Sequence, residues 1–294
     1  MTAGRPLYEA LRAALIVSEP VALATVVALG AGDEAEVGRG AGGGASAEAS
    51  AADLGSFVGA KLVVRPGYDQ AASGTLGDPE LDRVVTRDAL AALERGVTVT
   101  RHYGPRGEAR RDDVSVFIES FAPPPQLVIF GAVDFTAALA SAGRQLGFRV
   151  TVCDARPVFA TTRRFPAAHE VVVDWPDRLL ERIGGGLGPR DVICVLTHDT
   201  KFDVPAVLAA LRTRAGYIGA MGSRRTHEAR WRRLVEAGAD EDELRARLMS
   251  PIGLDIGART PEETAVAICA EIVSVRAGVR ASSLRDASGP IHRR

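Results

Sequence analysis

The chain has 294 residues, 46% hydrophobic and 25% charged, with a net charge of −1. This length and composition indicate a globular protein of two domains, and the near-neutral charge argues against nucleic-acid binding. No apolar run reaches the roughly 18 residues that a membrane span needs. The first residues lack an apolar signal core, so we expect a cytoplasmic protein.

The three cysteines, Cys153, Cys194 and Cys269, stand in apolar surroundings and lack metal-ligand spacing. We therefore expect buried, reduced thiols and no metal site.

Residues 1–121 predict an α+β domain. Its expected elements are a helix over 6–18, strands over 21–29, 57–64, 97–103 and 114–121, and a helix from Pro79 to about Leu93 with Asp78 as its cap. Pro66-Gly67 predicts a turn, and Ser73 to Gly77 is punctuated by glycines. Residues 30–52 are rich in Gly, Ala, Ser and acids, and this composition predicts a mobile loop.

Residues 122–126 contain three consecutive prolines and predict a stiff linker. Residues 127–279 then alternate short apolar runs with helical patterns, which predicts a Rossmann-like, doubly wound parallel sheet with strand order 3-2-1-4-5. Thr260 begins a capping box for the last helix. Residues 280–294 form a polar tail.

The unit from Leu127 to Asp154 resembles a dinucleotide-binding strand–helix–strand. Gly131 stands at the first turn and Asp154 ends the second strand, where that fold places its phosphate turn and its ribose-binding acid. However, Val133 replaces the second glycine of the pattern, and Asp134 puts a carboxylate beside the helix start. Nucleotide binding and a Rossmann-type sheet without a nucleotide site both remain open, and NAD is doubtful.

A first polar loop follows the strand 192–196. His198, Asp199 and Lys201 could form an acid–base group in which neighbouring charges set the pKa of the imidazole. Alternatively, Asp203 only caps the next helix and His198 is a polar loop residue.

A second loop, 219–227, combines glycines with positive charge. Gly219 and Gly222 allow backbone amides to point at a ligand, and Ser223 supplies a hydroxyl at a helix start. Arg224 and Arg225 supply positive charge for an anion such as phosphate. The alternative for Ser223 is a plain N-cap. The later Arg230, Arg232 and Arg233 are expected on a solvated helix face.

A third loop, 251–259, places Asp255 and Gly257 among apolar residues. If Asp255 is buried it needs a partner, and an arginine of the second loop is the natural candidate. A ligand site and a structural ion pair between the loops are both open.

The strings Thr197-His198-Asp199-x-Lys201, residues 216–227 and residues 251–263 resemble the XdhC/CoxI family. These are accessory proteins of xanthine dehydrogenase and carbon monoxide dehydrogenase. Residues 59–64 are similar to the first domain of that family.

The resemblance implies a chaperone-like maturation factor that is not itself a redox catalyst. It would bind the molybdenum cofactor (molybdopterin), assist its sulfuration, and insert it into an apo-enzyme of the molybdenum hydroxylase class. A cysteine desulfurase and a homodimer are the further partners that it implies. Gly222 to Arg225 would hold the phosphate of the cofactor, and His198, Asp199 and Lys201 would face its ring system or a partner.

Two departures from the family pattern stand out. Ser73 to Glu80 lacks the cysteine that the family carries there, and Gly131-Ala132-Val133-Asp134 stands where Gly-Ala-Gly-His is usual. Two other functions remain open: a nicotinamide-dependent oxidoreductase that uses Asp154 for ribose, and a non-catalytic interaction protein.

Overall fold

The computed structural model describes residues 4–30, 57–67, 71–109, 111–286 and 288. They fall into two compact units, Met1–Pro123 and Pro124–Arg294. The segment predicted as a mobile loop lies outside the described residues apart from Gly30, and so does the end of the polar tail. No helix among the described residues is long and apolar enough to cross a membrane.

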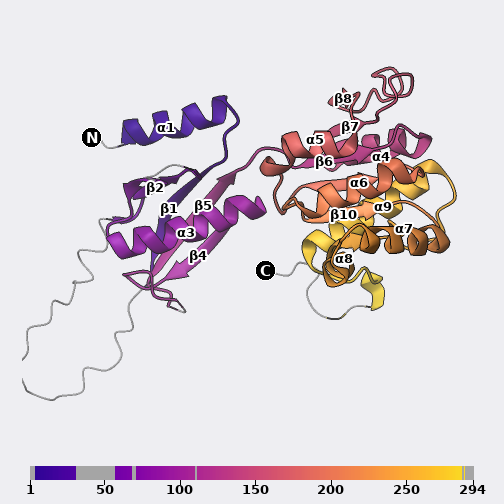
Figure 1. Cartoon of the computed structure of the whole chain (residues 1–294). Helices are drawn as coiled ribbons and strands as arrows, with labels where there is room; N and C mark the ends of the chain where they lie inside the picture. The colour runs from indigo at the N-terminus through magenta and orange to yellow at the C-terminus, as the bar shows by residue number, and fades with distance from the viewer. Residues whose placement is uncertain (1–3, 31–56, 68–70, 110, 287, 289–294) are drawn as a thin grey trace, which may run out of the picture. The chain divides into compact units, whose positions relative to one another are not determined.

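The first unit is an antiparallel sheet in the order β3-β2-β1-β5-β4 with a helix on each face (Figure 1). Helix α3 packs on the face that carries Ala22, Ala24 and Val26, and α1 packs on the opposite face. The predicted α+β arrangement is therefore confirmed. The elements are α1 (Gly4–Ile16), β1 (Val21–Leu29), β2 (Lys61–Val64), β3 (Ala72–Thr75), α3 (Pro79–Arg95), β4 (Val99–Tyr103) and β5 (Val114–Phe121).

One detail of this unit differs from the sequence-based expectation, and a second has no counterpart in it. The strand predicted from Phe57 begins only at Lys61, and the glycine-rich stretch forms the edge strand β3, which the sequence did not predict. Gly74 has φ +99°, and a Cβ there would lie 2.4 Å from the Lys61 carbonyl oxygen. Glycine therefore lets β3 approach β2 closely.

The second unit is a six-stranded parallel sheet in the order β11-β10-β9-β6-β7-β8. The predicted order of five strands is confirmed, and a sixth short strand extends one edge. Strands β6 and β9 are neighbours although two strands separate them in sequence, so the winding direction reverses between them. The strands are β6 (Gln126–Phe130), β7 (Arg149–Cys153), β8 (Glu170–Val172), β9 (Val192–Val195), β10 (Tyr217–Ala220) and β11 (Leu248–Met249).

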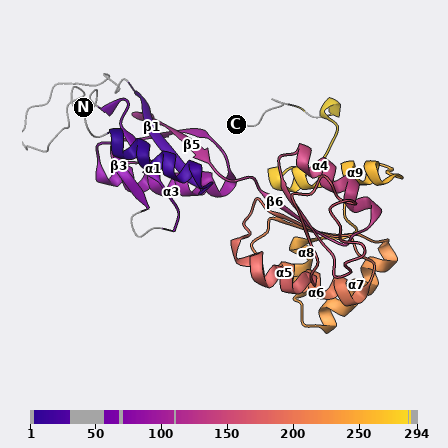
Figure 2. The same cartoon turned by 90° about the horizontal axis from the view of Figure 1, so that it is seen from above.

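Helices cover both faces of this sheet, as the turned view shows (Figure 2). One apolar core lies under α4 and α9, and a second lies under α5, α6, α7 and α8. Thr260 caps α9 and Glu263 completes the predicted capping box. The helices are α4 (Asp134–Gln145), α5 (Pro176–Ile183), α6 (Thr200–Leu211), α7 (Arg224–Glu236), α8 (Glu241–Arg247) and α9 (Pro261–Ala277).

Candidate functional site

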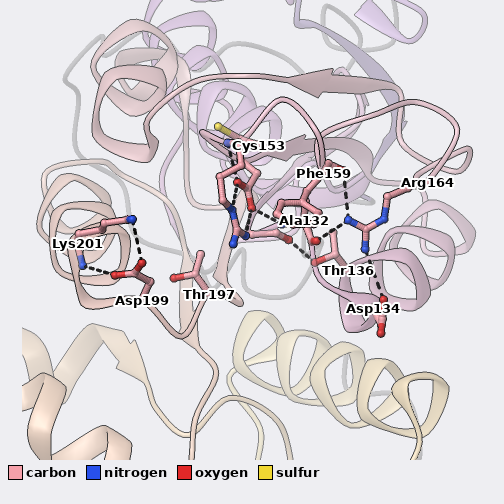
Figure 3. Close-up of polar contacts among 12 residues, drawn as sticks. Ala132, Asp134, Thr136, Cys153, Phe159, Arg164, Thr197, Asp199 and Lys201 are labelled. Carbon is pink, nitrogen blue, oxygen red and sulfur yellow. Dashed lines mark hydrogen bonds and ion pairs between the residues drawn. The ribbon is translucent and has the colours of Figure 1, made fainter.

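Four loops meet at the carboxyl edge of the parallel sheet, where ligands bind in folds of this class. They follow β6, β7, β9 and β10, and side chains from three of them lie together in Figure 3. Gly131 sits where the winding reverses, with φ +110°, and a Cβ there would lie 2.9 Å from Cγ2 of Thr197. The predicted role of Gly131 at a tight strand-to-helix turn therefore fits its surroundings.

Asp154 lies at the end of β7, and only 4% of the residue is exposed. Its Oδ2 accepts hydrogen bonds from the Ala132 amide at 2.7 Å and from Arg156 Nη2 at 2.8 Å. Its Oδ1 accepts from the Arg156 amide and from Arg156 Nε, both at 2.9 Å. A carboxylate offers about four acceptor positions, so the protein itself occupies all of them.

The pKa of Asp154 reflects two opposing effects. Burial raises it, but the hydrogen bonds from Arg156 and the Ala132 amide outweigh burial, and the pKa is lowered. Asp154 is thus an ionised, fully bonded carboxylate at neutral pH. A ribose hydroxyl could reach it only by displacing Arg156.

Arg164 covers the turn after β6, a role that the sequence did not suggest. Its Nη1 donates to the Ala132 carbonyl at 3.0 Å, and its Nη2 lies 3.5 Å from Asp134 Oδ1 (Figure 3). Arg164 comes from the connection between β7 and β8, far along the chain. The carboxylate of Asp134 and this guanidinium therefore stand at the start of α4, where a dinucleotide would place its pyrophosphate.

The loop after β9 brings the three predicted acid–base candidates to the surface. Asp199 caps α6 by accepting from the Lys201 amide at 3.1 Å, and it pairs with Lys201 Nζ at 3.2 Å. The amide hydrogen bond from Lys201 is the largest cause of a lowered pKa at Asp199. His198 is exposed beside this pair. The helix cap is Asp199, so the alternative in which Asp203 caps α6 is wrong.

Asp203 instead forms a buried ion pair with Arg230, and each residue is 2% exposed. Arg230 Nη2 donates to Asp203 Oδ2 at 2.8 Å and to the Met221 carbonyl at 2.7 Å. The hydroxyl of Thr197 bonds the other oxygen of Asp203. The expectation that Arg230 lies on a solvated face is therefore wrong, because α7 turns this side chain under the loops after β9 and β10.

The first turn of α7 carries the predicted anion-binding group. Ser223 is the N-cap and accepts from the Thr226 amide at 3.1 Å, so the plain capping role is present. Arg224 and Arg225 are exposed, and neither pairs with a carboxylate among the described residues. Within the part of the chain that the structure describes, the two guanidiniums therefore stand free at a helix N-terminus.

Two glycines, Gly219 and Gly222, precede the first turn of α7, and each is favoured for a different structural reason. Gly222 has φ +154°, a conformation that favours glycine. At Gly219 a Cβ would lie 2.4 Å from the Ile252 side chain, which indicates close packing and gives no sign of a ligand.

The third loop, residues 251–259, is held in place by Glu271 and not by Asp255. Asp255 is exposed and, among the described residues, has no ion pair with the second loop, so that predicted contact is wrong. Glu271 of α9 instead accepts from the Tyr217 hydroxyl at 2.5 Å and from the Gly253 amide at 2.8 Å. Gly257 is exposed, with φ +76° and open space around it.

The cysteines are buried, as predicted, and free. Burial raises the pKa of Cys153 to about 12 and that of Cys269 to about 11, and it also raises the pKa of Cys194. None of the three is a reactive thiolate at neutral pH.

The parallel-sheet unit matches a known domain family, and the chain is similar to several known proteins. Residues 127–272 match the model of the XdhC Rossmann domain. The chain is 33% identical over 162 residues, 55% of its length, to a protein of Bacillus subtilis (strain 168) named as a probable subunit of xanthine dehydrogenase. It is 28% identical over 160 residues, 54% of its length, to "Molybdenum cofactor insertion chaperone PaoD" of Escherichia coli (strain K12).

The chain spans less than half the length of these relatives, 46% and 43% respectively. A solved structure described as a xanthine dehydrogenase from Bacillus halodurans is 20% identical, over 94% of this chain and 97% of that chain, with a TM-score of 0.47. Residues 127–272 therefore belong to the XdhC Rossmann domain family.

Proposed function

We propose that this protein is a non-catalytic accessory factor of the cytoplasm. It binds the molybdenum cofactor, assists its sulfuration, and inserts it into a molybdenum hydroxylase of the xanthine dehydrogenase class. The family match and the names of the two relatives support this role. Because the chain spans less than half of those relatives, their activities come to it only as part of this proposal.

The observation that carries the proposal is the pair of exposed guanidiniums at the start of α7. Arg224 and Arg225 stand beside the amides of the first turn of a 13-residue helix, next to the N-cap Ser223. A phosphate monoester is recognised by this donor set, because planar guanidiniums and helix N-terminal amides both favour an anion. These residues therefore fit the phosphate end of molybdopterin, and the bound cofactor would supply the molybdenum chemistry to its target enzyme.

The saturated carboxylate of Asp154 argues against the nicotinamide-dependent alternative. Ribose recognition needs acceptor positions on that side chain, and the Ala132 amide and Arg156 use all of them. Asp134 and Arg164 also stand at the start of α4. We therefore place the ligand over the loops after β9 and β10, where His198 and Lys201 would face its ring system.

The proposed sulfuration step assigns the sulfur donor to a partner. All three cysteines are buried with raised pKa values. Residues 1–121 contain no cysteine. The chain would therefore hold and shield the cofactor while a cysteine desulfurase transfers sulfur to it directly. We further expect the factor to act as a homodimer, which light scattering on the purified protein would test.

Cofactor analysis of freshly purified protein tests the proposal. The protein should be produced in cells that make molybdopterin, and then oxidised to convert any bound pterin to its fluorescent form. We expect pterin to co-purify with the folded protein and nicotinamide to be absent. Finding nicotinamide without pterin would favour the oxidoreductase. Finding neither of the two compounds would favour a non-catalytic interaction protein.

A further inference from the structure

The first unit contains a pocket at the start of α3, next to the turn that joins β4 to β5. Its volume is about 270 Å³, far above the space that a single water molecule needs. Sites for small molecules are concave, are lined mainly by apolar side chains, and carry a few polar groups that orient the ligand. The lining of this pocket has both of these features.

The interior of the pocket is apolar. Four of its lining residues are core residues that are at most 3% exposed: Val26, Leu76, Leu81 and Val114. The ring of Phe57 adds to the lining, and it packs against the backbone of Gly77, where a Cβ would lie 2.5 Å from Cδ1 of the ring. Water gains few hydrogen bonds among such side chains, so an apolar group of a ligand would displace it favourably.

Two charged side chains, Asp78 and Arg106, also line the pocket. Asp78 caps α3, and its Oδ1 accepts from the amides of Glu80 at 2.8 Å and Leu81 at 3.1 Å. Its Oδ2 has no partner among the described residues. In the same part of the chain the Arg106 guanidinium has none either, because only its backbone amide is bonded, to Glu108 Oε2 at 2.9 Å. One carboxylate oxygen and one guanidinium are therefore available to a ligand.

Opposite charges at one apolar pocket favour a ligand that carries both charges. An anion alone would gain a contact with Arg106 but be repelled by Asp78, and a cation alone would meet the reverse. A zwitterion can place an ammonium group at Asp78 and a carboxylate at Arg106, and each contact is then a charge-assisted hydrogen bond. The apolar interior selects the side chain of such a ligand.

We propose that this pocket binds a free amino acid with an apolar side chain, such as leucine, methionine or phenylalanine. The side chain lies against Leu76, Leu81 and Val114, and the two charged ends pair with Asp78 and Arg106. The pocket belongs to the first unit, whereas the proposed cofactor site belongs to the second. This inference therefore does not rest on the proposed function.

Calorimetric titration of the full chain with free leucine, methionine and phenylalanine tests the pocket. We expect saturable binding with a dissociation constant in the millimolar range or below. Two analogues of leucine serve as controls, because isocaproate lacks the ammonium group and isoamylamine lacks the carboxylate. Each analogue should bind at least about tenfold more weakly than leucine, since it loses one charge-assisted hydrogen bond.

A substitution at Arg106 tests whether the binding belongs to this pocket. Arg106→Gln should weaken leucine binding by about tenfold and leave the melting temperature unchanged, because this side chain is exposed and without a partner among the described residues. Arg101→Gln is the matched control, since Arg101 is an exposed arginine of β4 that does not line the pocket. This control should bind leucine as the wild type does.

Three outcomes would overturn the amino-acid site. The first is the absence of saturable binding by all three amino acids. The second is equal affinity for leucine and for either analogue, which would contradict the role of the two charges. The third is wild-type affinity in the Arg106→Gln variant, which would contradict the pocket as the site. None of these outcomes bears on the proposed function, which cofactor analysis tests separately.

Discussion

Helix α7 presents arginines in two different environments only six positions apart. Arg230 is buried and bonds Asp203 and the Met221 carbonyl. Arg224 and Arg225 are exposed in the first turn without a carboxylate partner among the described residues. The same residue type thus holds loops together at one position of the helix and is available to a ligand at another. Burial, and not residue type, separates the structural arginine from the binding arginines.

The largest expected effect is on the free energy of unfolding, when the buried arginine Arg230 is replaced. Arg230→Ala leaves the Asp203 carboxylate buried without its partner, which should lower the free energy of unfolding by about 3–5 kcal/mol. Urea denaturation measures this loss. The matched control is Arg232→Ala on the exposed face of the same helix, which should change stability by less than about 0.5 kcal/mol. Equal losses in the two variants would show that the buried pair is not special.

The exposed pair should show the opposite behaviour. Replacing both Arg224 and Arg225 by alanine removes two charge-assisted contacts of roughly 1.5–3 kcal/mol each, so cofactor affinity should fall at least about tenfold. Stability should hardly change. The control replaces Arg232 and Arg233, two exposed arginines further along α7, and should bind as the wild type does. A large loss of stability with unchanged affinity per folded molecule would argue against an anion site.

Asp154 extends the comparison to a buried carboxylate whose contribution to stability depends on pH. Its pKa is lowered in the folded protein, so the charged form stabilises the fold above the unfolded-state value of about 4. That contribution disappears as the pH falls through the folded pKa. Asp154→Asn should therefore cost about 1–2 kcal/mol at neutral pH, and this difference should shrink in acid. A difference independent of pH would mean that the charge of Asp154 contributes nothing.

Ser223 should give the smallest effect. Its side chain caps α7, so Ser223→Ala should lower stability by about 1 kcal/mol. Its neutral hydroxyl should contribute less to ligand affinity than either guanidinium. Thermal melts and cofactor titrations on one set of variants compare the two roles. A fall in affinity larger than that of the arginine pair would make Ser223 the main binding group.

Local patterns predicted the strands, the caps and the loops that carry polar residues. The alternation of apolar runs specified the parallel sheet and its order, and Thr260 and Asp78 behaved as caps because capping depends on a few neighbouring residues. Contacts between distant segments could not be predicted in this way. Arg164 reaches Ala132 across 32 positions, and Glu271 reaches Tyr217 across 54.

The misjudged burial of Arg230 has the same cause. Helical spacing placed it with Arg232 and Arg233, yet only the packing of α7 against α6 decides which side faces inward. An ion pair of Asp255 with the second loop depended on the burial of Asp255, and its apolar neighbours in sequence do not bury it. A hint at Arg230 did exist: Asp203, three residues into a helix of mostly apolar residues, required a cationic partner.

The hydrogen bonds of Glu271 with Tyr217 and Gly253 also have a consequence for the order in which the protein folds during its synthesis on the ribosome. The chain emerges from its N-terminus, so the sheet strands are available before α9 is made. The third loop can form its hydrogen bond with the Glu271 carboxylate only after residue 271 has left the ribosomal exit tunnel. A nascent chain could therefore complete β10 early, but its carboxyl edge would reach its final form only after α9 has been synthesised.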